Sequence, residues 1–422
     1  MYSISYILLT KKMTTETSRA QPGWVPLLAL FTIAGFVESM VFGQLGAFIP
    51  LYLPRLGIPT QDVAAWTGAL AAFTGAVGIP FLPFWGALAD RYARQPIIVR
   101  SYVVELTAVV LMLIAGNIWV FLIGRCVTSL ALGNTGLMLT TLSERAPRNR
   151  LGLAFSVMNS APPVGAFLGP LLGGPLVDAL GFRALLLVDA AFLLIVVLAM
   201  TFGYRDSFQG TDRGPILHMA ADSVRIIGRS PRLRTLFAAL FLLFAGWTMA
   251  MTYVPLVIAR LYHGDQPGTA VGVIIGAGGL IALVFSPLVG MLADRFGHWR
   301  MLFIGATIIV LIWPLPLFVQ GLADFGATWA MINGMSSSIF ALSFMVLSTS
   351  AAADVRGRVM SYAFLPMNVG FMIGPAIGSI VTRASIFAIF PLAAVLTALG
   401  IAALWIARKQ PVADEAKSDI RA

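Results

Sequence analysis

Four ionisable side chains fall inside long apolar runs of this sequence: Glu38, Glu105, Arg125 and Asp189. An ionisable group in such surroundings is costly and indicates function by default. Burial favours the neutral form of a carboxyl and a nearby cation favours its ionised form, so the chemistry that these residue types suggest is the uptake and release of a proton. Helical rise places Glu38 and Arg125 at similar depths. We therefore expect Glu38 to carry the proton and Arg125 to tune it, with Glu105 and Asp189 as further proton-coupling candidates; the structural alternative is a fixed ion pair.

The apolar runs that carry these residues are long enough to cross a membrane. Of the 422 residues, 59% are hydrophobic and only 11% are charged, with a mean hydropathy of +0.89. The runs are continuous rather than alternating, which predicts helices and excludes a β-barrel. We expect an all-α polytopic membrane protein with 12 transmembrane helices near 26–53, 63–89, 96–116, 118–141, 151–179, 184–204, 235–259, 268–293, 301–320, 326–350, 358–382 and 384–407.

The basic residues predict how the chain is oriented. Of 28 lysines and arginines, 23 fall in segments on one side and only Arg55, Arg183, Arg260 and Arg383 on the other, with Arg125 inside a span. Positive charge collects on the cytoplasmic side, so both termini are predicted to be cytoplasmic. The net charge of +10 is explained in this way without nucleic acid.

The sequence offers no sign of catalysis or of a bound cofactor. The single cysteine, Cys126, allows no intrachain disulfide and is expected to be a small packing residue. The three histidines are scattered and suggest no metal site, no set of nucleophile and base is apparent, and no phosphate-binding loop of an ATP-driven pump occurs. We expect no enzymatic activity, no cofactor and no metal.

Two motifs recur at nearly one offset. "GALADRYARQ" after the second span is echoed by "GMLADRFGHWR" after the eighth, and "GAFLGPLLGG" in the fifth span is echoed by "GFMIGPAIGS" in the eleventh. Repeats in the same order predict two pseudo-symmetric six-helix halves. The expected organisation is an N-terminal tail (1–25), a first half (26–204), a central loop (205–233), a second half (234–407) and a C-terminal tail (408–422), with tails and loop cytoplasmic.

These motifs resemble those of the major facilitator superfamily over nearly the whole chain, and the fifth-span motif resembles that of bacterial drug:proton antiporters with 12 spans. In the loop motif Ala93 replaces a glycine of the family pattern. The resemblance implies gating roles for the motif residues, which are Gly86, Asp90, Arg91, Arg94, Gly165, Gly169, Pro170, Gly173, Gly174, Gly290, Asp294, Arg295, Gly374 and Pro375.

The fifth-span motif also has a physical interpretation. Small residues at a spacing of four allow helices to approach closely in lipid, and a proline bends a helix. Gly165, Gly169 and Gly173 form one such face beside Pro170, and we expect this face to seal one half against the other. Asp90 and Asp294 are expected to cap a neighbouring helix and to pair with arginines at the inward mouth. The alternatives are plain helix packing and solvated anchors.

Trp247, Met251 and Tyr253 are expected to line a substrate cavity, because aromatic rings and flexible methionines suit varied lipophilic ligands. The resemblance therefore implies proton-coupled efflux of lipophilic or amphipathic compounds by alternating access. The alternative is transport of one defined metabolite such as a sugar, an organic acid or a siderophore. The expected partners are a small-molecule substrate, protons and membrane lipid, and a monomer in the bacterial inner membrane is expected.

Overall fold

The computed structural model describes residues 23–81, 93–131, 134–204, 206, 225, 227–351, 359–360 and 362–411. Each of the twelve predicted spans contains a helix. The first half holds α2 (Trp24–Tyr52), α3 (Val63–Gly78), α5 (Arg94–Ile114), α6 (Ile118–Thr128), α7 (Asn134–Arg145), α8 (Leu151–Leu180) and α9 (Phe182–Gly203). The second half holds α11 (Pro231–Leu261), α12 (Pro267–Phe296), α13 (His298–Ile312), α14 (Leu322–Ser350), α16 (Leu365–Val381) and α17 (Ile389–Lys409).

Short 3₁₀ turns extend or join these helices: η1 (Leu53–Leu56), η2 (Thr60–Asp62), η3 (Ile79–Phe81), η4 (Arg148–Arg150), η5 (Leu315–Leu317) and η6 (Ile386–Ala388). The span predicted at 118–141 is made of two helices, α6 and α7. Local signals set several helix ends. Asn117 caps α6 by accepting from two backbone N–H groups, Ser230 caps α11, and Gly181 connects α8 to α9 with a φ of 86° that favours glycine.

Within the described ranges, ten helices, counted with their flanking 3₁₀ turns, are long and apolar enough to cross a membrane, and Ile118–Thr128 and Leu365–Val381 are shorter apolar helices. Large apolar side chains cover their outer faces. Phe202 is 71% exposed and Leu172 is 61% exposed, which a protein in water would not tolerate over so much of its surface. The prediction of an all-α polytopic membrane protein is confirmed.

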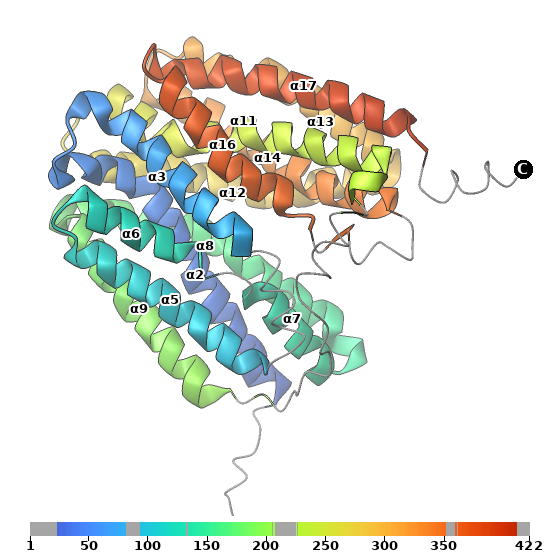
Figure 1. The fold of residues 1–422 in the computed structure, drawn as a ribbon, viewed down its shortest axis with the longest axis horizontal. Coiled ribbons are helices and arrows are strands. Elements are labelled where there is room, and N and C mark those ends of the chain that lie inside the picture. Colours follow the sequence, from blue (N-terminus) through green and yellow to red (C-terminus); the bar gives the residue numbers. More distant parts are fainter. Residues whose placement is uncertain are drawn as a thin grey trace, which may run out of the picture.

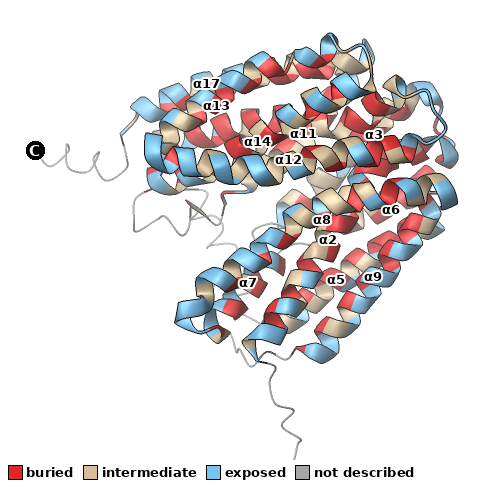
Figure 2. Ribbon diagram, turned by 180° about the vertical axis from the view of Figure 1, so that it is seen from behind, coloured by how far each residue is buried: buried red, intermediate tan, exposed pale blue. Residues whose placement is uncertain are grey.

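The helices form two bundles that follow the order of the sequence (Figure 1). The bundles lie close together at the end that carries residues 53–62, Gly181 and residues 262–266, which we call the joined end. They diverge toward the end where α2 begins and α17 finishes, which we call the splayed end (Figure 2). Buried residues gather inside each bundle and where the bundles meet at the joined end (Figure 2).

Two helix pairs make most of the contacts between the bundles. In one pair α8 of the first half packs on α12 of the second, and in the other α3 packs on α16. These pairs hold corresponding places in the two halves, as the sequence repeat requires. We call these two contacts the seam.

Candidate functional site

The Glu38 carboxyl lies near the middle of α2 and is held by a tyrosine from the neighbouring helix. Tyr102 of α5 donates its hydroxyl to Glu38 Oε2 at 3.1 Å and is fully buried. Asn134 at the start of α7 lies beside the same carboxyl and is also buried. The sequence analysis missed both partners because neither is ionisable near neutral pH, although Tyr102 precedes Glu105 by one helical turn and therefore shares its face.

Two further carboxyls extend this site into the first bundle. Glu105 of α5 is 8% exposed and lies within electrostatic reach of both Glu38 and Asp189 of α9. Asp189 is completely buried, and neither of its carboxyl oxygens has a hydrogen-bond partner among the described residues. A buried carboxyl without partners is far more costly as an ion than in its neutral form. The structure thus brings together three of the four sequence-predicted proton-coupling residues.

The fourth, Arg125, is placed apart from this group. No ion pair between Glu38 and Arg125 exists among the described residues, and the buried Nε of Arg125 has no hydrogen-bond partner there. Arg125 lies on α6, which packs chiefly on α5 and α3, whereas Glu38 is on α2. The structural alternative of a fixed ion pair is therefore not seen among the described residues, because equal depth along two helices does not fix the direction in which their side chains point. That Arg125 tunes Glu38 stays a prediction.

Aromatic rings from both halves meet one helical turn beyond Glu38. Phe42 of α2 contacts Phe371 of α16 with ring centroids 6.4 Å apart, and Phe371 contacts Trp247 of α11 at 6.3 Å, both edge to face. Phe42 is 55% exposed, and the Trp247 Nε1 has no hydrogen-bond partner in the described structure. The Phe42 ring is therefore open to a ligand, whereas the Trp247 Nε1 is buried in this conformation. Phe42 and Phe371 were not identified from the sequence.

The other two predicted cavity residues differ in exposure. Met251 is half-buried. Tyr253 is fully buried, and its hydroxyl donates to the Pro375 carbonyl at 2.9 Å. A Cβ added at Gly68 of α3 would overlap this hydroxyl, so Tyr253 occupies the seam in this conformation. Its role in binding substrate stays a prediction.

The glycine face of α8 packs within its own half. A Cβ at Gly165 would overlap the Phe36 carbonyl oxygen, one at Gly169 would lie 2.6 Å from the Met40 carbonyl oxygen, and one at Gly173 would meet Phe48 at 2.8 Å. All three contacts are with α2. The expectation that this face meets the other half is therefore wrong; Gly174, on the adjacent face, is the motif glycine that does so, 2.5 Å from the Gly268 carbonyl oxygen if a Cβ is added.

The two motif prolines make equivalent contacts across the seam. A Cβ at Gly272 of α12 would overlap the carbonyl oxygen of Pro170, and a Cβ at Gly68 of α3 would overlap that of Pro375. Gly272 and Gly68 differ in sequence position by 204, which matches the offset of the repeated motifs. The repeat therefore produces two backbone-to-backbone contacts of the same kind, and Gly374, like its counterpart Gly169, packs within its own half, against Ala245.

The structure describes only part of the loop motif. Gly86, Asp90 and Arg91 lie outside the described residues. Arg94 is 4% exposed and pairs with both Glu144 oxygens at 2.7 and 2.6 Å, which ties the start of α5 to the end of α7. In the second copy Asp294 contacts His298 at 3.2 Å on the surface, Arg295 lies over the Phe296 ring, and Gly290 has open space beside it.

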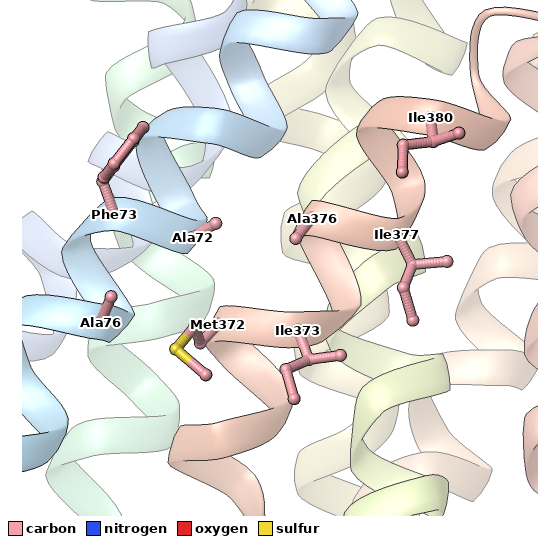
Figure 3. A pocket seen from close by; sticks show the side chains of 8 residues that line it. All are labelled: Ala72, Phe73, Ala76, Met372, Ile373, Ala376, Ile377 and Ile380. Atoms are coloured by element: carbon pink, nitrogen blue, oxygen red, sulfur yellow. The ribbon is translucent and has the colours of Figure 1, made fainter.

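A separate apolar pocket of about 370 Å³ lies against the α3–α16 side of the seam (Figure 3). Its lining contains no ionisable side chain, so it could accept an acyl chain or an apolar part of a ligand. The lining residues are Ala72, Phe73, Ala76, Met372, Ile373, Ala376, Ile377 and Ile380. Among the residues that the structure describes, no group of three or more His, Cys, Asp or Glu side chains could hold a metal ion.

The two helical bundles are related by an internal repeat. One bundle holds buried carboxyls, and aromatic rings lie between the two bundles. These features define a multi-pass membrane transporter. The sequence pattern of the Major Facilitator Superfamily matches residues 27–312 and 236–421. The chain belongs to this superfamily, which confirms the resemblance noted from its motifs.

Curated relatives and solved structures agree with this assignment. The chain is similar to the Multidrug resistance protein MdtG of Citrobacter koseri (28% identity, 85% of this chain and 89% of the relative). It is 29% identical to that of Enterobacter lignolyticus over 87% of this chain and 88% of the relative. The nucleoside transporter NupG has the same fold, with a TM-score of 0.75 at 14% identity over 91% of this chain and all of the other. The human organic anion transporter MFSD10 has a TM-score of 0.67 at 15% identity over the same shares.

Proposed function

We propose that this protein exports lipophilic or amphipathic compounds, cations among them, in exchange for protons by alternating access. The observation that carries the proposal is the Glu38 carboxyl one helical turn from Phe42, because an acid that can hold a proton stands beside aromatic rings from both halves. Aromatic faces attract cations as well as apolar groups. The similarity to proteins named for multidrug resistance supports the same substrate class.

Glu38 is proposed as the proton carrier, with Tyr102 as its hydrogen-bond donor. Glu105 and Asp189 are proposed as further proton-coupling groups, because Glu105 lies within electrostatic reach of both Glu38 and Asp189 and so links the three carboxyls. Arg125 remains a proposed coupling residue that acts without contact to Glu38 in this conformation. The gating motifs, a monomeric state, cytoplasmic termini and the division into halves at 26–204 and 234–407 belong to the same proposal.

The decisive experiment measures proton movement in everted membrane vesicles with a pH-sensitive dye. Addition of a lipophilic cation such as tetraphenylphosphonium should release protons from energised vesicles that contain the protein. Glu38→Gln should abolish this release, because glutamine cannot carry a proton, while substrate binding persists. Asp324→Asn also replaces a carboxyl by an amide, but at an exposed residue of α14, and this variant should behave like the unmodified protein.

Two outcomes would contradict the proposal. Proton release that persists in purified Glu38→Gln protein would remove Glu38 from the coupling mechanism. A response confined to a sugar, an organic acid or a siderophore, with none to lipophilic cations, would favour the alternative of one defined metabolite.

A further inference from the structure

The carboxylate of Asp178 joins the two halves at the joined end. Its Oδ1 accepts from the Gly268 backbone N–H at 2.8 Å. Its Oδ2 accepts from the backbone N–H of Thr269 at 2.6 Å and from the Thr269 Oγ1 hydroxyl at 2.6 Å. Asp178 lies in the last turn of α8 in the first half, whereas Gly268 and Thr269 are in the first turn of α12 in the second. One side chain therefore makes three hydrogen bonds between halves.

These bonds supply a cap that α12 lacks in its own sequence. The first N–H groups of a helix have no partners inside that helix. Gln266, the residue before α12, makes no side-chain cap, whereas α6 is capped by its own Asn117 and α11 by its own Ser230. The carboxylate is also the favourable charge at a helix N-terminus. The start of α12 is thus satisfied by the opposite half.

Close backbone contact allows the carboxylate to reach across. Gly174 lies one helical turn before Asp178, and a Cβ there would stand 2.5 Å from the Gly268 carbonyl oxygen. A Cβ at Gly268 would stand 2.8 Å from Asp178 Oδ1. All three hydrogen bonds therefore require α8 and α12 to touch, and all three break together if the halves separate at this end.

We propose that Asp178 is a positioning residue that latches the joined end and sets the balance between the two conformations of the transport cycle. When the joined end opens, water can bond to the Asp178 carboxylate and to the donors of Gly268 and Thr269. The net contribution of these hydrogen bonds to the free energy of the closed end is therefore modest, and the latch is reversible. Among the ion pairs of the described residues none involves Asp178, which leaves the start of α12 as its positive partner. The inference rests on the proposed alternating access but not on the identity of the substrate.

The test measures the distance between halves in purified, reconstituted protein. Cys126 is the chain's single cysteine, so Cys126→Ser provides a background for paired spin labels. Labels at Arg55→Cys and Arg383→Cys report on the joined end, and labels at Arg148→Cys and Arg300→Cys report on the splayed end; all four residues are exposed. Asp178→Ala should lengthen the first distance and shorten the second, with about a tenfold change in the ratio of the two populations, which corresponds to about 1.4 kcal/mol.

Matched variants separate the latch from other effects. Asp178→Asn keeps one acceptor oxygen and should give a smaller shift in the same direction. Asp265→Ala removes an exposed acid three residues before Gly268 and should leave both distances unchanged. An equal shift in Asp265→Ala would overturn the proposal, because the loss of any negative charge near the joined end would then be enough to change the distances.

A purely structural cap predicts something different. In that case Asp178→Ala would lower the unfolding temperature while the distance distributions stay as in the background protein, and this result would overturn the latch. If Asp178→Ala does not fold, an unchanged distribution in Asp178→Asn would overturn the latch in the same way. The distances need neither substrate nor a proton gradient, so a failure of drug-evoked proton release would reject the proposed function and leave this measurement intact.

Discussion

At the scale of single residues, the proposed proton chemistry depends on the surroundings of one carboxyl. The sequence marks Glu38 because an acid in an apolar run is costly. It does not mark Tyr102, whose hydroxyl makes the contact at 3.1 Å, because a tyrosine in such a run is ordinary. The sequence therefore predicted the titratable group and missed its partner, since partnership depends on how two helices are rotated about their axes.

Tyr102→Phe should alter the pH dependence of transport without abolishing it. Loss of the hydroxyl removes the hydrogen bond that Tyr102 donates to Glu38 Oε2, and the surroundings of the proposed proton carrier change with it. We expect the pH profile of substrate-driven proton release to change and the rate at neutral pH to fall severalfold. Tyr362→Phe, a tyrosine-to-phenylalanine change outside this site, serves as the control. A profile identical to that of the unmodified protein would assign Tyr102 a packing role only.

The separation of Arg125 from Glu38 can be tested by a double-mutant comparison of stability. Groups that do not touch contribute additively, within about 0.5 kcal/mol. We expect the free-energy changes of unfolding for Arg125→Ala and Glu38→Gln to add in the double mutant, measured by denaturant titration in detergent. A coupling energy above about 1 kcal/mol would show that the two side chains interact in a conformation other than this one.

At the scale of helices, the length of the apolar runs predicted a helix in each of the twelve spans, but not how the helices face one another. The spacing of Gly165, Gly169 and Gly173 correctly indicated a close helix contact. It could not indicate which helix was the partner, and the structure places α2 there instead of the other half. Small residues report close approach, whereas the partner depends on the arrangement of the whole bundle.

The seam predicts a sharp response to added side-chain volume. Gly272→Ala and Gly68→Ala each put a Cβ into a backbone carbonyl oxygen of the opposite half, which cannot move as a flexible side chain would. Each variant should hold the joined end apart and lower the transport rate at least tenfold, with normal expression. Gly46→Ala has open space around its Cβ and is the matched control. Normal transport by Gly272→Ala would mean that the seam need not close during the cycle.

At the scale of the whole molecule, the repeated motifs predicted two related halves, and the structure extends the symmetry to the seam. The carbonyl oxygens of Pro170 and Pro375 meet Gly272 and Gly68 in corresponding places. The Asp178 contact breaks this symmetry, because the α3–α16 side carries the Tyr253 hydroxyl on the Pro375 carbonyl instead. Which end of the molecule is joined could not be predicted, since one sequence must permit both arrangements in a transport cycle.

The distribution of basic residues predicts which side of the membrane each end faces. The splayed end, with the end of α17, should be cytoplasmic, and the joined end should face outward. In the Cys126→Ser background, a membrane-impermeant thiol reagent added to intact cells should label Asp265→Cys at the joined end. It should label Lys409→Cys, exposed at the end of α17, only after the membrane is permeabilised. Labelling of Lys409→Cys in intact cells would reverse the orientation. It would also change the proposed direction of the cycle, because this conformation would then present its splayed end to the outside.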